Sequence, residues 1–392
     1  MNVRRSAAVL AAAVVIGGTA TPAVAASPSP KPSLPSGLYG SGDPTYDGVW
    51  RQSYALIALH RVHENPPAAA VEWLAGQQCA NGAFPAFRAN PAKACDAKLM
   101  VDTNSTAAAA QALSAVGGHD SAVTEAVAWL KSVQNKDGGW GYAPGGASDA
   151  NSTSVVIGAL HTQDLSVPEV RVGTKSPYDA LLKLSLPCAD GGAFAYQPDK
   201  KGELRANADA TAAAVVAASG RDLLTAKPDI RGELTCADAP DLTRTRAATN
   251  GAAYLAAAVA KDGYLKSALP GAENQPDYGN TADAVVALAV QGGTGAARKP
   301  LEWLKRNSAK WAEQNGPAAW AQLILAAEAT GTDPRDFGGT DLVERLTATG
   351  PTPVSASQDD SGTSVWWMVG AGLAAGAGIG FLLSARNKRK QP

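Results

Sequence analysis

Residues 127–153 read VAWLKSVQNKDGGWGYAPGGASDANST and contain both halves of a repeat that decides the fold. The first half is an apolar segment ending in Trp129-Leu130, followed by Gln134 and a glycine-rich turn around Trp140. The second half is a polar segment, residues 149–153, placed directly before an apolar run. Apolar spacing, a glycine-rich stop and short polar residues before the next apolar run predict two helices joined by an irregular turn.

Both halves recur along the chain. Further copies of the first half end at Leu74, Leu182, Leu255 and Leu304, and glycine-containing turns follow the first three of these. Further copies of the second half begin near Asp47, Asp102, Asn207 and Asp277. Short polar side chains before an apolar helix accept hydrogen bonds from the free amides of its first turn. The polar segments therefore predict helix N-caps.

The repeats predict an all-α fold with two alternating classes of helix. Helices with polar starts are rich in alanine and apolar on nearly all sides, which predicts burial. They are expected near 50–62, 104–116, 151–162, 208–219, 280–290 and 317–329. Amphipathic outer helices are expected near 67–78, 120–134, 177–186, 246–260, 296–309 and 339–348. Because each hairpin can bury its apolar face only against its neighbours, we predict an α6/α6 toroid, a double barrel of six hairpins.

This unit resembles the Q-W, or prenyltransferase, repeat of the prenyltransferase and squalene-cyclase family. The same repeat occurs in the helical domain of transcobalamin and intrinsic factor and in their bacterial cell-surface relatives. Residues 138–153 and 333–343 are most similar to this last group. The similarity covers about 40–350 and implies the toroid fold.

The polar helix starts also predict a binding site. In a toroid they gather at one rim, where Asp and Asn side chains suit a large ligand edged with amides. Resemblance to transcobalamin implies a corrinoid, with the match longest at Asp149 and Asn151. The predicted ligand-binding residues are Asp47, Trp50, Asp102, Asn104, Asp149, Asn151, Asn207, Asp209, Asp277 and Asn280. The leading interpretation is a non-catalytic, cobalamin-binding protein that serves a membrane importer, with a separate β-rich lid protein because this chain has no β domain after 350.

Three alternatives stay open. A degenerate terpenoid cyclase would use Asp209, which matches the middle acid of the D-x-D-D motif, but Asn207 and Ala210 replace its partners. A lone carboxylate is a poor strong acid, so Asp209 is a weak catalytic candidate. A protein prenyltransferase would need an Asp, Cys and His zinc site, which the sequence lacks, and no metal is predicted. A toroidal polysaccharide lyase or hydrolase and a cell-surface interaction scaffold are the other readings of the fold.

The two ends predict an extracellular location. Residues 1–25 have the basic start, apolar run and small-residue cleavage pattern of a signal peptide. Residues 26–39 are a linker, 40–350 the toroid and 351–364 a second linker. Residues 365–383 carry no charge and are long enough for a transmembrane helix, and the basic tail 384–392 is expected in the cytoplasm. A sortase signal at Leu346 to Gly350 is the alternative means of attachment.

Cysteine content and charge agree with that location. Consecutive pairing of the four cysteines is favoured, giving disulfides Cys79–Cys95 and Cys188–Cys236, although three pairings exist. Without the leader and tail, 28 basic residues face 35 acidic ones. This negative balance excludes a protein that binds nucleic acid through its phosphates.

Overall fold

The computed structural model describes residues 36–351 except 230–233 and 270. The predicted signal peptide, most of the first linker, the second linker from 352, the predicted transmembrane helix and the basic tail lie outside the described residues. Within the described part, no helix has the length and apolar character needed to cross a membrane.

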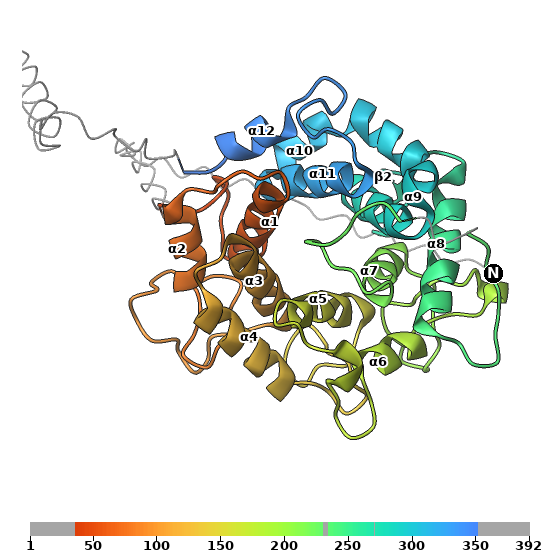
Figure 1. Cartoon of the computed structure of the whole chain (residues 1–392), viewed down its shortest axis with the longest axis horizontal. Coiled ribbons are helices and arrows are strands. Elements are labelled where there is room, and N and C mark those ends of the chain that lie inside the picture. The colour runs from red at the N-terminus through yellow and green to blue at the C-terminus, as the bar shows by residue number, and fades with distance from the viewer. Residues whose placement is uncertain (1–35, 230–233, 270, 352–392) are drawn as a thin grey trace, which may run out of the picture. The chain divides into compact units, whose positions relative to one another are not determined.

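A closed ring of inner helices forms the centre of the described chain (Figure 1). Each inner helix packs against the next one along the chain, and the last contacts the first, which closes the ring. The inner helices are α1 (Gly48–Arg61), α3 (Thr103–Val116), α5 (Ala150–His161), α7 (Ala208–Ala218), the first part of α9 (Tyr278–Asn307) and α11 (Pro317–Thr330). These residues are mostly Ala, Val and Leu at full burial, so small side chains let the helices approach closely.

Outer helices surround this ring and alternate with the inner ones. They are α2 (Ala68–Gly76), α4 (Asp120–Ser132), α6 (Pro177–Lys183), α8 (Arg244–Ala260), the second part of α9 and α12 (Leu342–Ala348). The described chain is therefore mostly helical and forms the predicted α/α toroid. Short elements complete it: the 3₁₀ turns η1 (Val167–Glu169) and η2 (Cys188–Asp190), and the antiparallel pair β1 (Leu265–Lys266) and β2 (Pro276–Asp277).

Two details differ from the prediction. The inner helix expected at 280–290 and the outer helix expected at 296–309 are joined as α9, because Gly293 turns the chain with φ 67° and ψ −170° and no further loop. This left-handed φ suits glycine, which lacks a Cβ atom. In addition, the sequence did not predict α10 (Ala309–Asn315), a short helix between α9 and α11.

The conserved-looking glutamine of each repeat joins successive outer helices. The Gln134 side-chain amide donates to the Gly138 carbonyl in its own turn (2.8 Å) and to the Val170 carbonyl ahead of α6 (3.3 Å). Gln78 makes the same two bonds in the preceding repeat, to Gly82 (3.0 Å) and Ala122 (2.8 Å). These paired bonds explain why both repeats place Gln just before the glycine turn.

Each glycine turn also packs into the core. Trp140 is fully buried, and its indole N–H donates to the Leu130 carbonyl (2.7 Å). Gly138 has φ 93°, and a Cβ atom there would lie 2.2 Å from the Ser176 carbonyl oxygen. The structure contains the disulfides Cys79–Cys95 and Cys188–Cys236, which is the favoured consecutive pairing.

Candidate active site

A cavity of about 340 Å³ lies inside the ring of inner helices. Its lining comes from the first turns of the inner helices at one end and from residues 221–223, after α7, at the other. The volume falls at the lower end of the range for sites that enclose small organic molecules. Side chains from α1, α3, α5, α7, α9 and α11 all contribute to the lining, so the cavity exists only because the ring is closed.

Five of the ten predicted ligand-binding residues line this cavity: Trp50, Asn104, Asn151, Asp209 and Asn280. They lie within the first turn of their helices, two or three residues after the polar residue that begins each segment.

The other five predicted residues do not line the cavity. Asp102, Asp149, Asn207 and Asp277 each accept a hydrogen bond from a backbone amide in the first turn of the following helix, as N-caps. Asp47 makes no such bond and instead lies 3.2 Å from Arg51. The polar ring predicted at the rim is thus divided between helix capping and cavity lining.

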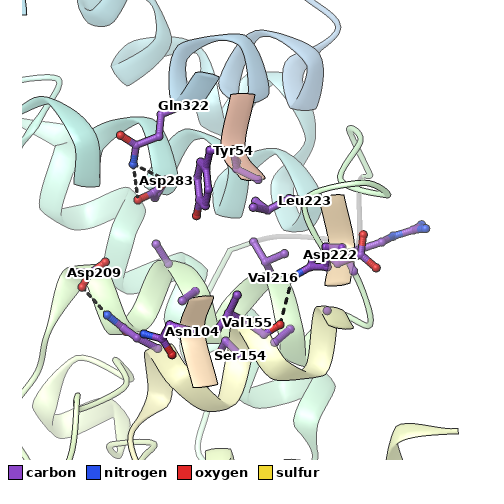
Figure 2. A pocket seen from close by; sticks show the side chains of 18 of the residues that line it. Tyr54, Asn104, Ser154, Val155, Asp209, Val216, Asp222, Leu223, Asp283 and Gln322 are labelled. Carbon is purple, nitrogen blue, oxygen red and sulfur yellow. Dashed lines mark hydrogen bonds between the residues drawn. The ribbon is translucent and has the colours of Figure 1, made fainter. Parts of the chain in front are cut away.

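Two carboxyl groups meet in the cavity at the end where the inner helices begin. Asp209 comes from α7 and Asp283 from the neighbouring α9 (Figure 2). The Asn151 amide donates to Asp209 Oδ2 at 2.5 Å. The Gln322 amide of α11 points at both oxygens of Asp283, at 3.3 and 3.5 Å. Each carboxyl group therefore has one amide donor, and no cation pairs with either of them among the described residues.

Burial and mutual repulsion raise the pKa of both groups. The pKa of Asp283 rises to about 8, chiefly because it is desolvated and next because Asp209 lies nearby. Desolvation also raises the pKa of Asp209, and its bond from Asn151 only partly opposes this. Two interacting carboxyl groups titrate as a pair, so the first proton is retained well above the usual range. At neutral pH the pair holds a proton.

Two aromatic rings from α1 flank this acidic pair. Trp50 and Tyr54 have ring centroids 4.8 Å apart, and both line the cavity. Burial, followed by the charges of Asp283 and Asp209, raises the pKa of Tyr54 well above its ordinary value, so its hydroxyl stays neutral. The faces of such rings stabilise a nearby positive charge.

Away from the acids the wall is largely apolar. Ala212, Ala213, Val216 and Ala217 of α7 lie opposite polar positions on α3 and α5, and Val286 and Leu223 continue the apolar surface. Figure 2 shows Leu223 and Asp222 on the opposite side of the cavity from Asp209.

Residues 221–226 cross the ring where the inner helices end. Arg61, the last residue of α1, donates to the carbonyls of Leu224 and Ala226, and His161, the last residue of α5, lies 3.0 Å from Asp222. Arg221 lines the cavity and lies 3.7 Å from Asp229. These contacts place the ionic groups of this end in pairs.

Sequence analysis missed several lining residues, notably Tyr54, Gln111, Ser154, Asp283 and Gln322. Asp283 left a signal, because it is an acid within the apolar run from Ala282 to Val290 of a helix predicted to be buried. Gln111 and Gln322 likewise interrupt apolar runs of inner helices. In the described part of the chain, no group of three or more His, Cys, Asp or Glu side chains could hold a metal ion.

No family model matches the chain, and no curated protein matches it. Among solved structures, it is similar to ent-copalyl diphosphate synthase from Streptomyces platensis, with 15% identity, 72% of this chain covered and a TM-score of 0.48. The type II terpene cyclase MstE from Scytonema has 14% identity, 80% coverage of this chain and a TM-score of 0.48. A sugar epimerase from a ruminal bacterium has 14% identity, 76% coverage and a TM-score of 0.46.

The match spans 50% of the first of these structures, 93% of MstE and 93% of the epimerase. All three are α/α-toroid folds, as the sequence predicted. The closer resemblance to transcobalamin gains no support from these comparisons.

The prediction of a non-catalytic, cobalamin-binding protein is wrong. The similar structures are named as terpene cyclases and an epimerase, which are enzymes. The structure supplies a physical reason as well, because Asp102, Asp149, Asn207 and Asp277 use their side chains as helix caps instead of presenting them to a ligand. A corrinoid also exceeds the cavity of about 340 Å³.

Proposed function

We propose that this protein is an enzyme that transfers a proton to a neutral, mostly apolar substrate and thereby isomerises or cyclises it. The supporting observation is the pair Asp209 and Asp283, which retains a proton at neutral pH inside a largely apolar cavity. Perturbed carboxyl groups that converge in an enclosed cavity are characteristic of catalytic sites.

The pair removes the objection that the sequence raised against acid catalysis. Asp209 lacks the neighbouring carboxylates of the D-x-D-D motif, and a single carboxyl group would have no partner to adjust its pKa. Asp283 supplies a partner from the next inner helix. The second acid comes from tertiary structure instead of from the local motif.

The roles of the residues follow from their surroundings. The O–H bond of the protonated carboxyl group breaks as the substrate accepts the proton, and the remaining carboxylate stabilises the positive charge that develops. Trp50 and Tyr54 present ring faces close to the same place. A base, Asp209 or water, then removes a proton from the product cation, so that the pair returns to its starting state.

The cavity favours an isoprenoid-like substrate over a sugar or a diphosphate. Its wall is made mainly of Ala, Val and Leu side chains, which cannot satisfy the many hydroxyls of a sugar. Three carboxyl groups line it, at Asp209, Asp222 and Asp283, against the single cation Arg221 among the described residues. An anionic substrate would be repelled near the acidic pair.

A substrate screen tests this proposal. The purified protein is incubated with neutral isoprenoids that carry an olefin or an epoxide, and organic extracts are analysed by gas chromatography and mass spectrometry. We expect a new isomer or cyclic product, and its rate should fall at least about 100-fold in Asp283→Asn. Asp336→Asn, at an exposed loop carboxylate, is the matched control and should keep full activity. Product formation that survives in Asp283→Asn contradicts the proposed acid.

We also propose that the toroid works at the cell surface. Two disulfides support an oxidising compartment, and the predicted signal peptide and membrane helix would deliver and retain the protein there. Protease treatment of intact cells tests this, since an exposed toroid should be digested while a cytoplasmic control survives. The earlier lid and importer predictions depended on corrinoid capture and are not carried further.

A further inference from the structure

Two polar side chains face the cavity without a partner in the protein. Gln111 of α3 is 2% exposed and Ser154 of α5 is 7% exposed, and both line the cavity. The Gln111 carbonyl oxygen Oε1 and the Ser154 hydroxyl oxygen Oγ are buried and make no hydrogen bond. Figure 2 shows Ser154 beside Val155 on the cavity wall.

The orientation of the Gln111 amide is fixed by its other end. Its nitrogen donates to the Val155 carbonyl at 3.1 Å and to the Ala107 carbonyl at 3.4 Å, and both of these atoms can only accept. Oε1 must therefore be the end left without a donor. Gly158 makes room for it, because a Cβ atom at that position would lie 2.6 Å from Oε1.

These two atoms would be costly if the cavity stayed empty. A buried polar atom without a partner typically destabilises a protein by about 1–3 kcal/mol, and such atoms are rare in native structures. The facing wall is made of Ala212, Ala213 and Val216, which have no side-chain donor or acceptor. Their partner must therefore come from a molecule in the cavity.

The position of this pair relative to the acids follows from helix geometry. Asn151, which holds Asp209, and Ser154 lie on the same helix, three residues apart. At 1.5 Å per residue, Ser154 is about 4.5 Å along α5 from Asn151, and the Gly158 position beside Gln111 is about 10 Å along it. A single small molecule can therefore reach both the acidic pair and the unpaired atoms.

We infer that Gln111 and Ser154 form a subsite for one hydroxyl group of the substrate, an inference that rests on the proposed function for the identity of the reacting end. The substrate O–H donates to Gln111 Oε1, and the substrate oxygen accepts from the Ser154 hydroxyl. Both unpaired atoms are then satisfied by one group that is itself a donor and an acceptor. The substrate class becomes an isoprenoid-like alcohol, whose hydroxyl binds here and whose carbon skeleton extends toward Asp283.

Equilibrium dialysis of the full chain with two probes of the same skeleton tests the subsite. The probes are farnesol and the matched hydrocarbon that lacks the hydroxyl group. Wild-type protein should bind farnesol about tenfold more tightly than the hydrocarbon, the usual effect of one well-placed hydrogen-bonding group. In Gln111→Leu this preference should fall to near onefold while the hydrocarbon affinity is kept, and Ser154→Ala should reduce it about threefold.

Gln291→Leu is the matched control. Gln291 is also a fully buried glutamine of an inner helix, but it bonds to Ser219 and does not line the cavity. This variant should retain the full preference for farnesol. Equal binding of the two probes by the wild-type protein, as expected if only water fills the subsite, overturns the inference. So does failure to bind farnesol, or a preference that persists in both Gln111→Leu and Ser154→Ala.

Binding and turnover separate this inference from the proposed function. The preference for farnesol should survive in Asp283→Asn, which lacks the acid but keeps the subsite. A protein that discriminates between the probes but converts no isoprenoid would leave the subsite standing and overturn the proposed reaction. Conversion with no discrimination would do the reverse.

Discussion

The first turn of each inner helix contains two kinds of polar position that look alike in sequence and differ in environment. Asp149 accepts bonds from the Ser152 amide (2.7 Å) and hydroxyl (2.9 Å), and its side chain serves the backbone of α5. Asn151, two residues later, turns into the cavity and holds the carboxyl group of Asp209. Asn207 and Asp209 divide in the same way at the start of α7.

The difference shows that capping and chemistry are assigned by helix phase. A residue before the first turn lies over the free amides of the helix, whereas a residue two or three positions later points sideways from its axis. In an inner helix of a closed ring, one sideways direction is the central cavity. Substitutions at the two kinds of position should therefore separate stability from activity.

The largest separation is expected at Asp209. Asp209→Asn should reduce turnover by 10²-fold or more, because the pair loses one of its two ionisable groups. Asp149→Asn should stay within about threefold of wild-type turnover, since the amide oxygen can still cap α5. Steady-state rates on the substrate found by the screen provide the measurement. Comparable losses in both variants would show that the distinction between capping and cavity positions is wrong.

The next effect is a dependence of stability on pH that comes from the cavity set. The pKa of Asp283 is about 8 in the folded protein and near 3.8 in the unfolded chain, so between these values the folded state binds the extra proton. Stability should therefore be greatest below about pH 4 and fall as the pH rises through about 8, by roughly 2–3 kcal/mol once cavity water is allowed for.

Urea unfolding at pH 5 and pH 8.5 measures this slope. Asp209 has a raised pKa as well and contributes in the same direction. Asp283→Asn should flatten most of the slope, because asparagine does not titrate. A slope that is unchanged in this variant would place its origin elsewhere, for example in the buried caps Asp102 and Asp149, whose pKa values are also raised by desolvation.

The capping positions should give a smaller effect on stability. Asp102→Ala and Asp149→Ala each remove a cap bond, of 2.6 Å to the Ser105 amide and 2.7 Å to the Ser152 amide. The expected loss is about 1–2 kcal/mol in the free energy of unfolding. Thermal or urea denaturation measures it, with turnover at a temperature well below the transition as the second readout. A variant that loses turnover without losing stability would place that carboxylate in the reaction.

The smallest effect is expected at Asp47, which occupies the same place in the repeat without capping its helix. Its side chain is 48% exposed and is paired with Arg51 at 3.2 Å. An exposed ion pair typically contributes less than about 1 kcal/mol. Asp47→Ala should therefore change the free energy of unfolding by less than about 0.5 kcal/mol, and a loss as large as that of Asp149→Ala would refute the assignment from cap geometry.

The sequence allowed the helices to be predicted because their signals are local. Polar N-caps such as Asp102, apolar runs and glycine turns such as the one at Gly138 are each contained within a few residues. The acidic pair could be predicted only in part. Asp209 stands at a recognisable helix start, but its meeting with Asp283 depends on the side-by-side packing of α7 and α9. Nor does the sequence indicate which polar residue of a repeat faces inward, since one residue of helix phase decides it.

The corrinoid interpretation failed for that reason. It treated Asp149 and Asn151 as equivalent groups at a rim, whereas one of them is consumed by the backbone.

The turn at Gly293 has a consequence for engineering. Because a single residue separates the inner part of α9 from its outer part, extra amino acids at this point would displace an entire hairpin and open the barrel. The connection from α2 to α3, residues 77–102, is long and is stapled by Cys79–Cys95. A reporter peptide or a new module should therefore be accommodated in that connection and rejected at Gly293, which makes these two places a natural pair for insertional mapping.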